Sequence, residues 1–153
     1  MTFRDSGPGP IAVLALAAAI GFGAGTPRAA AVDDPQLARF EASASAEPEN
    51  LWLGALYRQR AIQVGAYDRA IKMFDRLASR RDAGPNVFIS LGLAYVDKVP
   101  TVTPFRRIFV GHDAGAAITK SIDRRPSLVA YYVRGLISLF YPEAVFHRGR
   151  QGV

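Results

Sequence analysis

The clearest helical pattern in the chain is YDRAIKMFDRLASR, residues 67–80. Its apolar side chains recur every three or four positions and so share one face of a helix, while charged side chains cover the rest. The apolar face holds Tyr67, Ala70, Ile71, Phe74, Leu77 and Ala78. The segment DAGP at 82–85 ends the helix, because glycine favours a helix C-cap and proline cannot continue one. This stretch predicts an amphipathic helix that packs against other helices.

Three similar segments flank this helix: LGALY at 53–57, LGLAY at 91–95 and RGLIS at 134–138. Each has a glycine on a helical pattern, and the glycines are separated by 38 and 43 positions. Periods of this size indicate stacked helical units. Glycine within a helix costs about 1 kcal/mol relative to alanine, so its repetition indicates that a second helix crosses close to the backbone.

These segments resemble the tetratricopeptide repeat family, whose units are two antiparallel helices. The resemblance rests on repeat-packing positions Leu53, Gly54, Tyr57, Tyr67, Ala70, Phe74, Phe88, Leu91, Gly92, Tyr95, Tyr131 and Gly135. It covers residues 48–140, as units at about 48–82 and 86–125 and a half unit at 127–140. It implies an all-α fold in which antiparallel helix pairs stack as a short α-solenoid.

The second unit is longer than the family pattern, and we expect its extra residues 99–112 to form a non-helical insert. The insert contains two prolines and the run Phe105-Arg106-Arg107. It ends at His112-Asp113, where a carboxylate could hold a general base. The favoured interpretation is structural: Asp113 caps the following helix, and Gly111 turns the chain into it.

The segments outside the repeats have different patterns. Residues 1–31 combine a weakly basic start, the uncharged stretch 11–25 and small side chains at Ala29 and Ala31, which is typical of a secretory signal peptide cleaved after Ala31. An uncleaved membrane anchor is the alternative, although about 20 apolar residues are needed to span a bilayer. We expect a flexible linker at 32–47, with a short helical turn around Leu37–Phe40, and an irregular tail at 141–153.

The composition of the 153 residues excludes several kinds of site. There is no cysteine, which rules out disulfides and thiolate chemistry, and the two histidines make a histidine metal cluster improbable. Lysine and arginine number 19 against 13 acidic residues, for a net charge of +6. The arginine doublets at 80–81, 106–107 and 124–125 are expected to be solvated at helix ends, with an anionic surface as the alternative. Nucleic acid is not an expected partner of an exported protein, and no cofactor is predicted.

We therefore expect an exported, periplasmic or secreted scaffold without catalytic activity, which binds another protein or peptide of the cell envelope in a concave groove. The family's register places in that groove Ala55, Arg58, Gln59, Asn86, Ile89, Leu93, Asp97, Tyr132 and Leu136. An apolar peptide or amphipathic helix fits these side chains better than a terminal carboxylate. Two alternatives stay open. The last helix, which has no complete partner helix after it, could mediate self-assembly into a homo-oligomer, or the chain could be a truncated version of a longer repeat protein.

Overall fold

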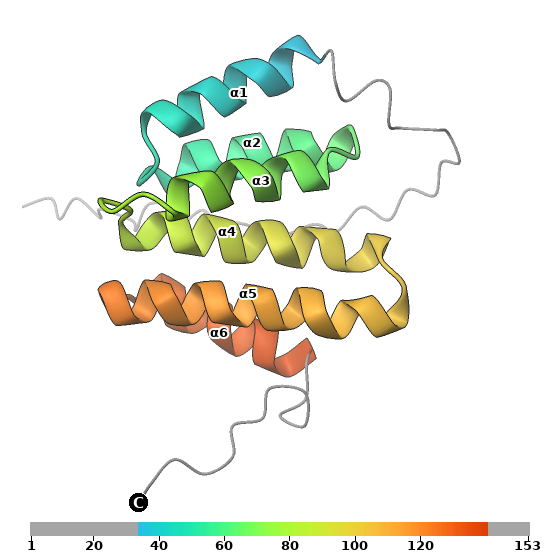
Figure 1. Ribbon diagram of the computed structural model, residues 1–153, viewed down its shortest axis with the longest axis vertical. Helices are drawn as coiled ribbons and strands as arrows, with labels where there is room; N and C mark the ends of the chain where they lie inside the picture. Colours follow the sequence, from blue (N-terminus) through green and yellow to red (C-terminus); the bar gives the residue numbers. More distant parts are fainter. Residues whose placement is uncertain (1–33, 141–153) are drawn as a thin grey trace, which may run out of the picture.

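The computed structural model describes residues 34–140, and every regular element in this range is helical (Figure 1). The elements are α1 (Pro35–Ala46), α2 (Leu51–Gln63), α3 (Tyr67–Ala78), α4 (Pro85–Lys98), the 3-10 turn η1 (Val99–Thr101), α5 (Pro104–Arg124) and α6 (Leu128–Phe140). The prediction of an all-α protein is confirmed for this part of the chain. The predicted signal peptide at 1–31 and the tail at 141–153 lie outside the described residues.

Successive helices run in opposite directions, and each packs against the next (Figure 1). The central helix is α4, which contacts α2, α3, α5 and α6. In the view of Figure 1, α2 lies behind α3 and α6 lies behind α5. The glycine-bearing helices α2 and α4 are thus each followed by an antiparallel partner, α3 and α5.

Two apolar clusters meet at α4. The first is built from α1, α2, α3, α4 and α5 and has Tyr57 and Phe74 at its centre, with ring centroids 5.8 Å apart. The second joins α4, α5 and α6 and contains Ile89, Ile118 and Ile137. Tyr95 packs against both clusters. Burial of these apolar side chains is the main force that holds the helices together.

Glycines allow the close helix crossings that the repeat pattern predicts. A Cβ added at Gly92 on α4 would lie 2.7 Å from Cδ1 of Ile118 on α5, closer than two non-bonded carbon atoms can approach. A Cβ at Gly54 on α2 would lie 2.9 Å from Oγ of Ser90 on α4. Gly65 has a different role: its φ of 71° closes the tight connection between α2 and α3.

The prediction of a flexible linker at 32–47 is wrong for residues 35–46, which form α1. Asp34 caps this helix, since its Oδ1 accepts a hydrogen bond from the Leu37 amide at 2.6 Å, and Pro35 suits the first helical turn. Leu37 and Ala44 are buried against the first cluster.

The expected non-helical insert at 99–112 is also wrong over most of its length. Only residues 99–103 separate α4 from α5, because Pro104 occupies the first turn of α5, where proline is tolerated. Gly111 and Asp113 consequently lie inside a 21-residue helix, so Asp113 is not an N-cap and Gly111 is not a turn. Residues 104–112, which we expected in the insert, form the first turns of α5.

Candidate protein-interaction surface

The predicted groove residues lie on α2, α4 and α6, and the structure gives them different environments. Gln59 and Tyr132 are exposed, whereas Ala55, Asn86, Leu93 and Leu136 are half-buried. Ile89 is fully buried in the second cluster, so its assignment to a groove is wrong. Its side chain belongs to the apolar cluster that joins α4, α5 and α6.

Two further predicted groove residues bind each other. Nε of Arg58 on α2 lies 2.7 Å from Oδ2 of Asp97 on α4, and Nη2 of Arg58 lies 3.3 Å from Oδ1. The two side chains are only 15% and 17% exposed. Asp97 also acts on Tyr67, whose pKa is raised first by burial and then by this negative charge. The ion pair connects α2 with α4 and occupies both charges.

An exposed strip on α2 contains two residues that the predicted groove did not include. Trp52 is 63% exposed, and Ile62 is 41% exposed. With Ala55 and Gln59 they recur at intervals of three or four positions, so the four side chains share one helix face. We call them the α2 strip. The spacing of these four residues is visible in the sequence. Which face of α2 is buried, however, depends on how the neighbouring helices pack against it.

Asn86 is held by the chain itself at the start of α4. Its side-chain amide donates to the Glu49 carbonyl oxygen at 2.9 Å. The Glu49 carboxylate in turn accepts hydrogen bonds from the Asn86 and Val87 amides, both at 3.3 Å. Glu49 therefore caps α4 from the α1–α2 connection, in place of the missing side-chain cap at Gly84. The role of Asn86 here is structural.

The repeat-packing positions of the first two units lie in or beside the apolar clusters. Buried positions are Gly54, Tyr57, Ala70, Phe74, Phe88, Leu91 and Gly92, and half-buried positions are Leu53, Tyr67 and Tyr95. The half unit differs, because Tyr131 is 53% exposed and a Cβ at Gly135 would meet nothing within 4 Å. Their assignment as packing residues is wrong for the described chain, in which no helix follows α6 to cover them.

The outer face of α6 is apolar and exposed. Its exposed side chains are Leu128, Val129, Tyr131, Tyr132 and Leu139, with Leu128 and Leu139 at 89% and 80%. Ala130, Val133 and Ile137 on the opposite face are buried against α4 and α5. An exposed patch of this kind is typical of a surface that another helix covers.

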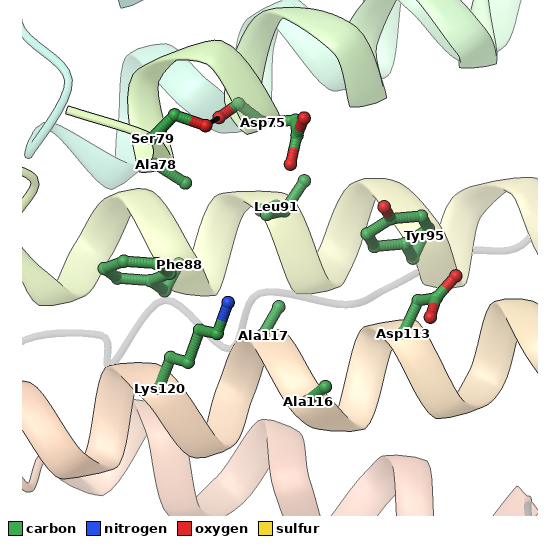
Figure 2. Close-up of a pocket in the computed structure, with 10 residues that line it drawn as sticks. All are labelled: Asp75, Ala78, Ser79, Phe88, Leu91, Tyr95, Asp113, Ala116, Ala117 and Lys120. Carbon is green, nitrogen blue, oxygen red and sulfur yellow. Dashed lines mark hydrogen bonds between the residues drawn. The ribbon is translucent and has the colours of Figure 1, made fainter.

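A shallow cavity of about 310 Å³ lies between α3, α4 and α5 (Figure 2). Phe88, Leu91 and Tyr95 of α4 form its floor, and Asp75, Asp113 and Lys120 stand at its rim. The pKa of Tyr95 is raised first by burial and then by the charges of Asp113 and Asp75. The mixed charges favour no single class of ligand.

The His112–Asp113 pair has no geometry that would orient a general base. Nδ1 of His112 lies 3.7 Å from Oδ1 of Asp113, and the side chains are 64% and 54% exposed. A catalytic base is usually held by a hydrogen bond to its orienting group. Within residues 34–140 no group of three or more acidic or histidine side chains is placed to hold a metal ion.

Comparisons of the chain with protein-family models, with curated proteins and with solved structures find no match. Within the described range, no helix has both the length and the apolar character needed to cross a bilayer.

Proposed function

We propose that this protein is an exported, non-catalytic scaffold of the tetratricopeptide type, which binds another protein or peptide along the first helices of its repeats. The alternating helices and the central position of α4 support a short α-solenoid, in which α2, α4 and α6 would line the concave face. On this view α1 corresponds to the second helix of a preceding half unit.

The observation that carries the proposal is the α2 strip. Trp52 and Ile62 are large apolar side chains that the fold leaves in solvent, and Gln59 between them can donate and accept hydrogen bonds. Tryptophan is enriched among residues that dominate binding energy at protein interfaces. The Arg58 guanidinium beside the strip is paired with Asp97 and is not free to bind a terminal carboxylate. The strip therefore suits an amphipathic helix or an apolar extended segment.

Peptide selection tests this function directly. The chain from Val32 onward would be used to select binders from a phage-displayed random peptide library, and the affinities of the selected peptides would be measured by calorimetry. We expect Trp52→Ala to weaken binding about tenfold or more, as for a central interface aromatic. Phe105→Ala, which removes an aromatic that is 71% exposed on α5, is the matched control. An equal loss of peptide affinity in both variants, or the failure to select any binding peptide, contradicts the proposal.

Export is a separate part of the proposal and has its own test. The full chain would be expressed in a bacterial host, and the N-terminus of the protein recovered from the periplasm would be sequenced. Cleavage after Ala31 yields a chain that begins at Val32. A protein that stays in the cytoplasm with residues 1–31 attached contradicts export but leaves the binding surface untouched.

Self-assembly through α6 is a second candidate, favoured by a specific observation at Gly135. The equivalent glycine of α4, Gly92, is covered by Ile118 of the helix that follows it, whereas Gly135 has open space and exposed apolar neighbours. A second copy could place its own α6 against this face, since a two-fold contact needs only one self-complementary patch. Helix α1, at the other end of the described chain, exposes no large apolar side chain, so a head-to-tail contact is less favourable.

Sedimentation equilibrium of the chain from Val32 onward distinguishes this candidate from a monomeric scaffold. Self-assembly predicts a mass that doubles with concentration, and it predicts that Tyr132→Ser combined with Leu139→Ser restores the monomer. Trp52→Ser is the matched control because it removes an exposed aromatic from α2. A monomeric wild type at all concentrations rejects self-assembly, and the α2 strip is still testable.

A further inference from the structure

The first two turns of α5 leave their side chains in solvent. Every residue from Pro104 to Phe109 is exposed, and the first buried residue of α5 is Gly111. These turns lie beside η1, close to the end of α4 (Figure 1). They fall within residues 99–112, the predicted insert, so the repeat resemblance does not require them. We call residues 104–110 the exposed turns.

The exposed turns carry large apolar side chains on the side that faces away from the fold. Phe105, Ile108 and Phe109 are 71%, 41% and 56% exposed. They share one helix face, and the two phenylalanine rings meet edge to face with centroids 5.2 Å apart. The buried side of α5 holds Ala114 and Ile118, about half a helical turn around the axis from this face. The rings therefore point into solvent, away from α4 and α6.

The same two turns carry positive charge without acidic neighbours in the sequence. Arg106 and Arg107 are both exposed, and no ion pair joins either of them to a carboxylate of residues 34–140. Nε of Arg107 donates to the Val102 carbonyl oxygen at 3.3 Å. From Val99 to His112 the chain contains no aspartate or glutamate. The exposed N-terminal end of α5 adds a partial positive charge of its own.

We propose that residues 104–110, the exposed turns of α5, bind the surface of a bilayer that contains anionic phospholipids. Phe105, Ile108 and Phe109 enter the boundary between headgroups and acyl chains, and Arg106, at the side of this face, contacts phosphate groups. Arg107 lies further around the helix, and its positive charge adds to the attraction toward the anionic surface. Exposed aromatic and branched apolar residues flanked by arginine are the composition of helices that lie in this interface. Basic residues close to an anionic surface add to the binding energy.

Flotation with phospholipid vesicles tests this inference. The sample is the chain from Val32 onward, which contains both apolar clusters and every cap described above, after circular dichroism has shown a cooperative melt. The probes are vesicles of phosphatidylcholine alone and vesicles in which about a third of the lipid is phosphatidylglycerol. We expect the protein to float with the anionic vesicles and to stay in solution with the neutral ones. Added salt should weaken the binding, because it screens exposed charges.

Two double variants locate the site. Arg106→Ala with Arg107→Ala should weaken binding about 30-fold, the effect of two cations near an anionic surface. Phe105→Ser with Phe109→Ser should weaken it about tenfold or more through lost apolar burial. The matched controls are Arg80→Ala with Arg81→Ala, which removes another exposed doublet, and Trp52→Ser, which removes another exposed aromatic.

The outcomes are distinct. Binding to anionic vesicles that depends on both pairs and on neither control supports the site. No flotation with anionic vesicles overturns the inference, as does binding that persists in the Phe105→Ser/Phe109→Ser protein. Loss in the Arg80→Ala/Arg81→Ala control equal to that in Arg106→Ala/Arg107→Ala also overturns it, because net charge alone would then explain the binding. None of these results bears on peptide binding by the α2 strip.

Discussion

Arg58 on α2 and Asp97 on α4 form a two-point ion pair, with Nε–Oδ2 and Nη2–Oδ1 distances of 2.7 and 3.3 Å. It joins α2 and α4 at least one helical turn past the point where Gly54 of α2 approaches Ser90 of α4. The register of the repeat family predicts that Arg58 and Asp97 face a ligand in the groove. In the tertiary structure the two side chains bind each other instead.

Breaking this ion pair should destabilise the fold. Arg58→Ala leaves the Asp97 carboxylate largely shielded from water and unpaired, which we expect to lower the free energy of unfolding by about 1–3 kcal/mol. Chemical denaturation of Arg58→Ala, Asp97→Asn and the double variant would measure the coupling between the two side chains. Arg80→Ala is the control. The side chains of Arg80 and its partner Asp82 are 52% and 74% exposed, so their ion pair should contribute little to stability. Additive effects of the two single substitutions would refute the coupling.

Gly92 and Gly135 form a matched pair for the close-crossing argument. Gly92→Ala would place a Cβ against Cδ1 and Cγ1 of the fully buried Ile118, at 2.7 and 2.9 Å. We expect a loss of stability of about 1–3 kcal/mol from overpacking. Gly135→Ala meets no atom within 4 Å and should raise stability by about 0.5–1 kcal/mol through helix propensity. Thermal melts of both variants measure these changes in stability. Equal changes in stability at the two positions would contradict the argument that Gly92 is needed for a close helix crossing.

Glu49 should stabilise α4 although it lies outside that helix. Glu49→Ala removes the acceptor for the Asn86 and Val87 amides and a negative charge near the positive end of the helix. We expect a loss of about 1 kcal/mol, similar to that of an N-cap. Glu49→Gln, which keeps an acceptor without the charge, should lose less. If urea denaturation gives Glu49→Ala the same midpoint as the wild type, the capping role is rejected.

Tyr57 should make the fold sensitive to alkaline pH. Burial, followed by the negative charge of Glu41, raises the pKa of Tyr57 above its ordinary value of 10.0. The fold therefore favours the neutral phenol, and this stabilisation is complete below pH 10.0 and is lost as the pH rises further. Its hydroxyl also donates to Oε2 of Glu41 at 3.3 Å.

The variant Tyr57→Phe separates these two effects. Near neutral pH its free energy of unfolding should be about 0.5–1.5 kcal/mol lower than that of the wild type, because the hydrogen bond to Glu41 is lost. Above pH 10.0 this difference in stability should become smaller, because phenylalanine cannot ionise in the core. Denaturation midpoints of both proteins at a series of pH values provide the measurement. A constant difference across the series would show that ionisation of Tyr57 does not limit alkaline stability.

Periodicity in the sequence predicted most helices but misjudged two segments, for different reasons. Residues 35–46 are rich in alanine and serine, and only the buried Leu37 and the capping Asp34 mark them as a helix. Residues 104–112 contain an apolar stripe that faces solvent. An apolar stripe is buried in one helix of this protein and exposed in another. The stripe alone therefore does not show whether a helix face is buried, which depends on the neighbouring helices.

The sequence by itself determined the helical class, the strongest core positions and the absence of cysteine chemistry, because these follow from local spacing and residue type. Tertiary structure alone decided which apolar face of each helix is buried. It paired Arg58 with Asp97 across 39 positions, placed Ile118 over Gly92 and left Gly135 uncovered. Those outcomes depend on contacts between residues far apart in the chain, which local periodicity does not encode.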